Sequence, residues 1–194
     1  MYSRSLQSDP VPCMAGHGAQ AARDYAAGMS APKSLLIVYH SMTGGTRQMA
    51  ESARAGAAAE ASVEVRLLHA SQAGPDEVLA ADGLIFATPE NLAAMSGQLK
   101  DFFDRSYYAV LDRVNGRAYA SLVCAGSDGR NAARQIERIA AGWRLKPIAE
   151  PLIVYTQAQT AQAILAPKHI TAEDLERCRT LGEAMAAGLA LGVF

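Results

Sequence analysis

The sequence predicts an α/β protein built on a doubly wound parallel sheet, and two observations lead to this prediction. From residue 34 onward, short apolar runs alternate with longer stretches in which apolar residues recur at helical spacing. Several of the apolar runs are nearly continuous, which is typical of parallel strands that helices cover on both faces. Two parallel strands need a crossover between them, so strands and helices that alternate in this way form βαβ units.

Five stretches are predicted to be strands, at residues 34–40, 63–68, 83–88, 118–125 and 151–155. The first, third and fourth are almost wholly apolar, so we expect them in the middle of the sheet. The second alternates apolar and polar residues, which favours an edge strand with one face exposed.

Helical spacing predicts helices at residues 47–60, 97–110, 131–143 and 172–189, with a weaker one at 75–80. In the second of these, the spacing of Leu99, Phe102 and Phe103 predicts that they face the core. Right-handed crossovers then place a crevice at the carboxyl ends of the first, third and fourth strands.

The loop after the first strand is a candidate phosphate site, and it consists of Ser41, Met42, Thr43, Gly44, Gly45 and Thr46. Its hydroxyls are donors, and its glycines let backbone amides approach an anion closely. The following helix start adds free N–H groups. The loop lacks the Gly-Lys-Ser/Thr and G-x-G-x-x-G patterns, so it suits a monophosphate held by neutral donors. The alternative is an ordinary helix start capped by Thr43 or Thr46.

Two further loops follow the third and fourth strands. The first contains Thr88, Pro89, Glu90, Asn91, Leu92 and Met95, and the second contains Gly126, Ser127, Asp128 and Gly129. The first loop combines polar edges with an apolar tip, Leu92 and Met95, which suits a planar heterocycle, although Met95 could equally serve in packing. Asp128 could instead cap the next helix. Three such loops at neighbouring strand ends predict one ligand site.

Composition excludes several classes of function. The 194 residues carry a net charge of −1, which argues against nucleic-acid binding and against a strongly acidic electron carrier. No apolar stretch is long enough for a membrane span. The cysteines, Cys13, Cys124 and Cys178, form no metal-binding pattern and predict reduced thiols in a cytoplasmic protein, with Cys124 in the core.

Residues 1–32 differ from the rest of the chain. They are rich in turn-forming residues and show little periodicity, although residues 19–27 could form a short helix. They lack the apolar core of a secretory signal, and Met29 resembles a natural start. The sequence thus predicts a weakly structured N-terminal extension at 1–32 and one domain at 33–194.

The first two loops resemble those of a known family. Ser41-x-Thr43-Gly44-x-Thr46 resembles the FMN-phosphate loop of flavodoxin-like proteins. Thr88-Pro89, followed by Met95-Ser96-Gly97-Gln98-Leu99-Lys100-x-Phe102-x-Asp104, is similar to the second flavin loop and helix of the NAD(P)H:quinone and FMN reductases, especially the tryptophan-repressor-binding-protein type. The resemblance covers about residues 33–194. It implies a flavodoxin-like five-stranded parallel sheet in the order 2-1-3-4-5, with helices on both faces.

The resemblance also implies roles for the three loops. Residues 41–46 would hold the FMN phosphate, with Met42 contributing backbone. Residues 88–92 would border the isoalloxazine ring, and residues 126–129 would meet its pyrimidine edge. The chain departs from the family at Gly45, where asparagine is usual, and in having no aromatic pair around Leu92 and Met95. The third loop also lacks the longer glycine run of typical quinone reductases.

The implied function is an FMN-dependent oxidoreductase that takes electrons from NADPH or NADH and passes them to a quinone, a flavin or a similar small acceptor. The flavin carries the chemistry at its N5 atom, so no side chain is predicted to be catalytic. A homodimer or homotetramer would fit a site completed by a neighbour, and residues 157–168 could be a lid, a subunit contact or a plain surface loop.

Two alternatives remain open at this stage. One is an electron-transfer flavoprotein that has a protein partner and no nicotinamide site. The other is a flavodoxin-like interaction module that binds no flavin.

Overall fold

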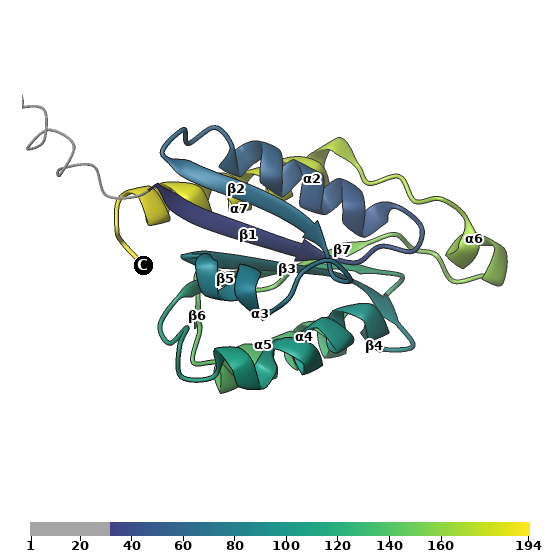
Figure 1. The fold of residues 1–194 in the computed structure, drawn as a ribbon. Helices are drawn as coiled ribbons and strands as arrows, with labels where there is room; N and C mark the ends of the chain where they lie inside the picture. Colours follow the sequence, from purple (N-terminus) through teal and green to yellow (C-terminus); the bar gives the residue numbers. More distant parts are fainter. Residues whose placement is uncertain (1–31) are drawn as a thin grey trace, which may run out of the picture. The chain divides into compact units, whose positions relative to one another are not determined.

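The computed structural model describes residues 32–194, which fold as a sheet between two layers of helices (Figure 1). Neighbouring strands follow the order β2-β1-β3-β5, and β6 and β7 both pair with the outer side of β5. The strand bounds are β1 Lys33–Tyr39, β2 Val63–His69, β3 Gly83–Asn91, β4 Ala94–Met95, β5 Ala118–Ala125, β6 Lys146–Pro147 and β7 Leu152–Tyr155.

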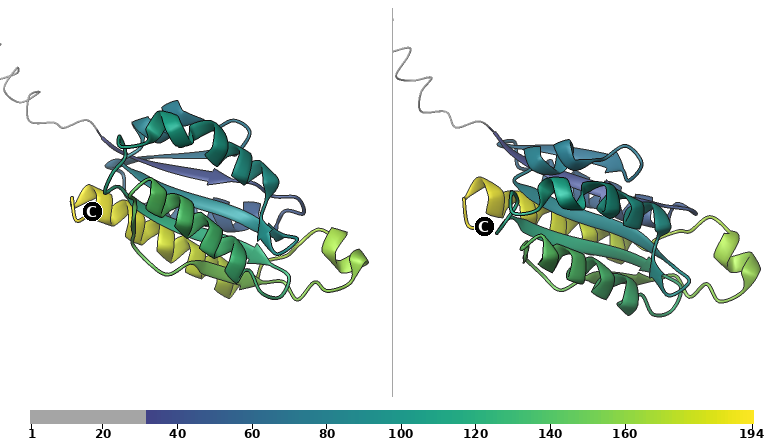
Figure 2. Two further views of the ribbon diagram at one scale, coloured as in Figure 1. Left: turned by 90° about the horizontal axis from the view of Figure 1, so that it is seen from below. Right: turned by 60° about the horizontal axis from the view of Figure 1, so that its bottom comes forward.

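The helices cover both faces of the sheet, as predicted (Figure 2). One face packs against α2 (Gly45–Ala57) and α7 (Ala172–Ala190). The other packs against α3 (Pro75–Ala80), α4 (Gly97–Val110) and α5 (Arg130–Gly142). These helices and the five long strands confirm the predicted flavodoxin-like architecture, and β2 lies at the predicted edge.

The fifth position of the sheet is split between β6 and β7. The start of β5 pairs with β6, and its end pairs with β7 through Leu122↔Leu152 to Ala125↔Tyr155. Pro147 and Pro151 flank the interruption, and neither has the N–H group that a continuous ladder would require. The prediction of a single strand at 151–155 therefore found only the second half of this position.

The hairpin formed by β3 and β4 was not predicted. β3 continues to Asn91 and then turns back, so that Glu90 pairs with Met95 and Asn91 with Ala94 in antiparallel fashion. The two turn residues, Leu92 and Ala93, have φ angles of 51° and 59°. Positive φ at both positions is what a two-residue hairpin with a type I′ turn requires, and it normally selects Asn-Gly. The residues found here, Leu92 and Ala93, do not predict a hairpin turn from the sequence.

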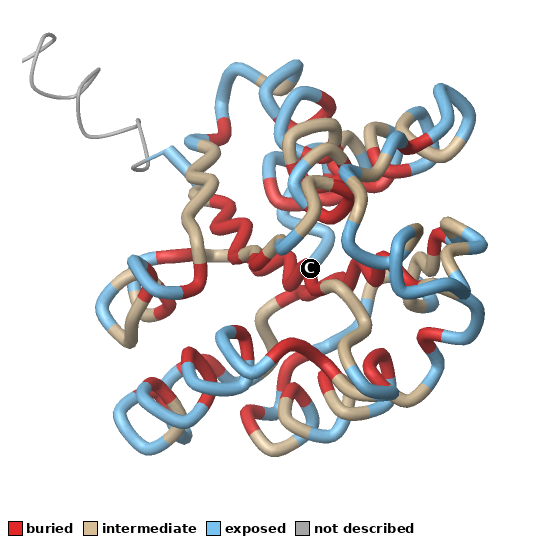
Figure 3. Tube along the Cα trace, turned by 90° about the vertical axis from the view of Figure 1, so that its right-hand side faces the viewer, coloured by how far each residue is buried: buried red, intermediate tan, exposed pale blue. Residues whose placement is uncertain are grey.

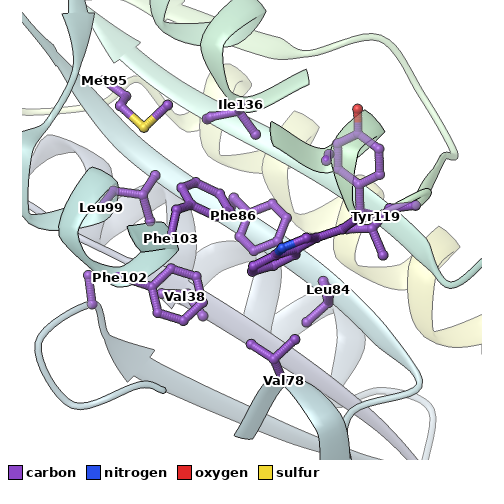
Figure 4. Close-up of a cluster of buried hydrophobic side chains, with 14 of the residues drawn as sticks. Val38, Val78, Leu84, Phe86, Met95, Leu99, Phe102, Phe103, Tyr119 and Ile136 are labelled. Carbon is purple, nitrogen blue, oxygen red and sulfur yellow. The ribbon is translucent and has the colours of Figure 1, made fainter. Parts of the chain in front are cut away.

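The core of the α3–α5 face contains a cluster of aromatic side chains among aliphatic ones (Figure 4). Phe86 on β3 lies 4.9 Å, centroid to centroid, from Phe103, which in turn lies 5.4 Å from the fully buried Trp143. Leu99 and Phe102 are also buried, which confirms the predicted inward face of α4. Figure 3 shows the buried residues along the strands and on the inward sides of the helices.

Helices α2 and α7 approach each other unusually closely at two glycines. A Cβ atom on Gly182 would lie 1.9 Å from the carbonyl oxygen of Ala53, and one on Gly56 would lie 2.0 Å from that of Arg179. The two backbones are therefore in direct contact, and a methyl group at either glycine has no room. This contact holds the last helix against the helix that follows the first loop.

Some predictions concern residues outside the described part of the chain. Cys13, the short helix at 19–27 and nearly all of the proposed extension lie there. Within residues 32–194, no helix combines the length and apolar character needed to cross a membrane.

The close contact of α2 and α7 leads to a stability prediction. Alanine normally stabilises a helix relative to glycine, but Gly182→Ala should lower the free energy of unfolding by about 1–3 kcal/mol because the new methyl group overlaps the Ala53 carbonyl. Urea denaturation measures the difference. Gly97→Ala is the control, because nothing lies within 4 Å of the added Cβ there. This control should be neutral or stabilising, and equal effects of the two substitutions would contradict the prediction.

Candidate functional site

A cavity of about 500 Å³ lies where the three predicted loops meet, at the carboxyl ends of β1, β3 and β5. The same end of the sheet carries α6 (Ala161–Leu165), on the right in Figure 1. The volume is within the range of small-molecule and cofactor sites, roughly 300–1,000 Å³. The position is the one that parallel α/β sheets use for ligands.

Most of the residues predicted to bind a ligand line this cavity. They are Ser41, Met42, Thr43, Gly45, Thr46, Pro89, Glu90, Asn91, Leu92, Gly126 and Ser127. The structure thus brings residues from all three loops to one cavity.

Five predicted ligand residues do not line the cavity: Gly44, Thr88, Met95, Asp128 and Gly129. Thr88 is fully buried, and its hydroxyl accepts a hydrogen bond from the backbone N–H of Ser96 (2.9 Å) at the base of the hairpin. Met95 is 5% exposed and packs in the core beside α4 and α5. The packing alternative for Met95 is therefore the one observed, because strand β4 turns its side chain inward.

Glycines, not hydroxyl side chains, begin the two helices at the cavity. Gly44 and Gly129 occupy the N-cap positions of α2 and α5 with left-handed φ angles of 89° and 74°, and neither helix has a side-chain cap. Neither Thr43 nor Thr46 caps α2, and Asp128 does not cap α5. Asp128 instead forms an exposed ion pair with Arg130 at 2.6 Å. The plain capping interpretation is therefore wrong for both loops.

The first loop has the features of an anion site. The hydroxyl Oγ1 of Thr46 is buried at the cavity wall beside the Cys124 thiol, and it forms no hydrogen bond of good geometry with any described residue. The first turn of α2 contains no acidic residue that would compete for its free N–H groups. Burying an unpaired hydroxyl costs about 1–3 kcal/mol, so a ligand oxygen at this position would satisfy a group that the protein leaves unsatisfied.

Gly45 gives the loop its close fit. A Cβ atom at this position would lie 2.6 Å from Sγ of Cys124 and 3.2 Å from Cβ of Lys168. A larger residue here would push the start of α2 away from the end of β5. The family usually has asparagine at position 45. In this chain, glycine leaves room for the side chains of Cys124 and Lys168, which pack against the loop.

Sequence reasoning missed several residues of the cavity: Ala93, Cys124, Ala125, Thr156, Ala158, Ile164 and Lys168. Most of these come from the segment after β7. From the sequence, residues 157–168 could be a lid, a subunit contact or a plain surface loop, and their position in the fold places them beside the cavity.

Lys168 connects this segment to the first loop. Its backbone N–H donates to the carbonyl oxygen of Thr43 at 2.8 Å. The side-chain amide of Gln48 donates to the carbonyl oxygens of Lys168 (2.7 Å) and Gly44 (3.1 Å) and accepts from the N–H of Ile170. These bonds tie residues separated by 120 positions in the sequence.

The ammonium group of Lys168 also shapes the segment itself. It donates to the carbonyl oxygens of Ala163, Ile164 and Ala166 at 2.7–2.9 Å, around the end of α6. A positive charge at a helix end with free carbonyl groups is favourable. Residues 157–168 thus form a wall of the cavity, and a Cβ atom on Gly126 would lie only 3.0 Å from the carbonyl oxygen of Ala158.

Two titratable groups near the site are held neutral by burial. Burial raises the pKa of the Cys124 thiol, and the adjacent Thr46 hydroxyl and then the charge of Lys168 only partly oppose this, so the thiol stays protonated at the cavity wall. Burial, and then the neighbouring His69, lower the pKa of His40. Within residues 32–194, no three His, Cys, Asp or Glu side chains are grouped closely enough to bind a metal ion.

Comparison with known sequences gives flavoprotein relatives. The family model described as NADPH-dependent FMN reductase matches residues 72–160. A flavodoxin of Aquifex aeolicus (strain VF5) is 29% identical, covering 82% of this chain and 88% of the relative. An NAD(P)H dehydrogenase (quinone) of Acidithiobacillus ferrooxidans is 32% identical over 92 residues, which are 37% of this chain and 46% of the relative.

Solved structures show the same fold. A WrbA-like flavodoxin from Agrobacterium tumefaciens superposes with a TM-score of 0.65 at 21% identity, covering 82% of this chain and 98% of that one. A flavodoxin from the domain Archaea gives 0.66 at 19% identity, covering 81% and 99%. The chain has a flavodoxin-like fold and is similar to flavodoxin-like FMN proteins, and the matches support an oxidoreductase.

The unpaired hydroxyl of Thr46 leads to a prediction with two opposite effects. Thr46→Val should leave the free energy of unfolding unchanged or raise it by about 1 kcal/mol, because an unsatisfied buried group is removed. The same change should weaken FMN binding about tenfold, as expected for the loss of one hydrogen bond to a charged group. Urea denaturation and fluorescence titration with FMN measure the two effects.

Ser106→Ala is the matched control for this prediction. Its hydroxyl is also buried without a partner, but it lies on α4 away from the cavity. It should show the stability effect without the loss of FMN affinity. Unchanged FMN affinity in Thr46→Val would contradict the assignment of Thr46.

The turn of the β3–β4 hairpin leads to a further prediction. Replacing Leu92-Ala93 by Asn-Gly should raise the free energy of unfolding by about 1 kcal/mol, because these residues adopt positive φ at lower cost. Thermal unfolding measures the change. Ala94→Gly, in the adjoining strand, serves as the control and should be destabilising. A loss of stability in the Asn-Gly variant would show that the turn is not of type I′.

Proposed function

We propose that the protein is an FMN-dependent oxidoreductase that takes electrons from NADPH or NADH and passes them to a quinone, a flavin or a similar small acceptor. The matching family description and the quinone dehydrogenase relative support this proposal. Bound FMN would supply the redox chemistry, which no side chain of the cavity provides.

The residues of the cavity would bind and orient the cofactor. The Thr46 hydroxyl and the free N–H groups of the first turn of α2 would hold the phosphate. The ring would lie between residues 89–92 and the backbone at 126–127, which belong to two different loops that line the cavity. N–H groups at 126–127 would stabilise negative charge on the ring. Lys168, in the same lining, would contribute a positive charge that the first loop itself does not contain.

The observation that favours an enzyme is the absence of aromatic side chains from the lining of this cavity. Its apolar walls are aliphatic and come from Pro89, Leu92, Ala158 and Ile164. No Phe, Tyr or Trp is among the described residues that line the cavity. A flavin bound here would not be enclosed between aromatic side chains of the lining, which would leave a face for stacking of a nicotinamide, a quinone or a free flavin.

One alternative has support of its own. The relative from Aquifex aeolicus is a flavodoxin, and it covers most of this chain. An electron carrier with a protein partner therefore remains the second candidate function. The net charge of −1 argues against it, because such carriers rely on charge complementarity to dock.

The location of the protein is a further part of the proposal. Cys124 and Cys178 are buried and carry free thiols. Unpaired cysteines favour a reducing compartment, and we place the protein in the cytoplasm on this basis.

The proposal is tested by titration with FMN followed by assays of NADPH and NADH oxidation. We expect FMN to bind at least tenfold more tightly than riboflavin, which lacks the phosphate that the first loop would hold. We also expect sustained oxidation of a reduced nicotinamide when a quinone or free FMN is present. Uptake of FMN without turnover with any small acceptor would favour the carrier, and no uptake of FMN would reject both.

A further inference from the structure

A separate cavity of about 280 Å³ lies at the interruption between β6 and β7. On the outer side of β5, the ladder includes Ala118 and Tyr119 through β6 and resumes with β7 only at Leu122. Ser121 lies in the gap between these two pairings and lines the cavity. None of the described residues that line this cavity also lines the candidate cofactor site. A ligand bound here would therefore be additional to FMN.

Two buried hydroxyl groups belong to the lining of this cavity. Tyr119 and Ser121 are 5% and 3% exposed, and the alternation of side chains along β5 turns both toward α5. Figure 4 shows the Tyr119 hydroxyl pointing away from the aromatic cluster. Neither hydroxyl forms a hydrogen bond within residues 32–194. Because buried hydroxyls in proteins usually have a partner, this pair indicates a polar ligand.

Two carboxylates give the cavity a negative charge. Glu137 lines it from α5, and Glu150 lines it from the segment between β6 and β7. Within residues 32–194, neither carboxylate forms an ion pair, and no Lys or Arg lines the cavity. Burial, and then the charge of Glu137, raise the pKa of Tyr119, so its hydroxyl stays protonated. The polar part of the cavity thus consists of two unpaired anions and two neutral hydroxyls.

The rest of the lining is apolar. It comes from Ala141, Leu145, Pro147, Ala149 and Pro151. The volume lies just below the roughly 300–1,000 Å³ of typical ligand sites, so the cavity suits a small molecule. A ligand with a cationic head and a short alkyl chain would match both the acidic and the apolar parts of the lining.

We propose that this cavity binds a small alkylamine in its ammonium form. The three N–H donors of an ammonium group match the acceptors that Glu137, Glu150 and Ser121 offer. The alkyl chain would pack on Pro147 and Pro151. The two carboxylates would repel an anion, and no three His, Cys, Asp or Glu side chains of residues 32–194 are grouped for a metal ion. The inference goes beyond the proposed function, and it does not require FMN.

The test compares three four-carbon probes on the full chain: 1,4-diaminobutane, 1,4-butanediol and succinate. They are similar in length and differ in charge. NMR titration of the isotope-labelled chain measures each affinity and shows whether amides around the cavity respond. We expect the diamine to bind with a dissociation constant of about 1 mM or lower, and at least tenfold more tightly than the diol or succinate. Added salt should weaken the binding of the diamine.

Two variants test the assigned groups. Glu137→Gln should weaken the diamine about fivefold, because it removes one charge and keeps the shape of the side chain. Ser121→Ala should weaken it about threefold without lowering the free energy of unfolding, because it removes an unpaired hydroxyl. Glu64→Gln is the matched control, since it removes an equal charge from an exposed position of β2, at the opposite edge of the sheet.

Three results would overturn the inference. They are equal affinities for the diamine and the diol, an unchanged affinity for the diamine in Glu137→Gln or Ser121→Ala, and displacement of the diamine by an equal concentration of Mg²⁺, which would indicate a metal site instead. Failure of FMN uptake in the unaltered chain would reject the proposed function alone, because these titrations are carried out without FMN.

Discussion

The parallel pairing of β1, β3 and β5 is the constraint on which the site depends. Tyr39 pairs with Ala87, and Pro89 pairs with Cys124, so the three strands end at the same edge of the sheet. All three strands are buried on both faces, and a shift in register would expose apolar side chains and leave backbone groups unpaired. The loops that follow therefore converge wherever this sheet forms. The ligand site is a consequence of the same packing that stabilises the core.

The segment after β7 completes the site through backbone and amide hydrogen bonds. Gln48 and the backbone of Lys168 join it to the first loop, and the Lys168 ammonium group holds the end of α6. The α2–α7 contact at Gly56 and Gly182 keeps the following helix close, so the segment is anchored on both sides. A segment that carries no binding motif thereby becomes one wall of a cavity.

The β3–β4 hairpin forms one wall of the candidate site, because residues 89–93 line its cavity. Its turn uses Leu92 and Ala93 at positive φ, where Asn-Gly would be less strained. Strain of this kind persists where the surrounding structure enforces it, and here Asn131 and Gln135 hold the hairpin from α5.

The sequence by itself determined the five main strands, the helices of both layers and the three loops of the site. These features follow from local periodicity and from the chemistry of neighbouring residues, as in Ser41 to Thr46. Only the tertiary structure decided that Met95 is buried, that Gly44 rather than a threonine begins α2, and that Lys168 joins the site. Each of these depends on contacts between residues far apart in the chain, or on backbone φ angles that the residue types do not predict. Local sequence patterns predict the helix or strand to which a residue belongs. The residues that face it across the cavity depend on how the whole sheet is assembled.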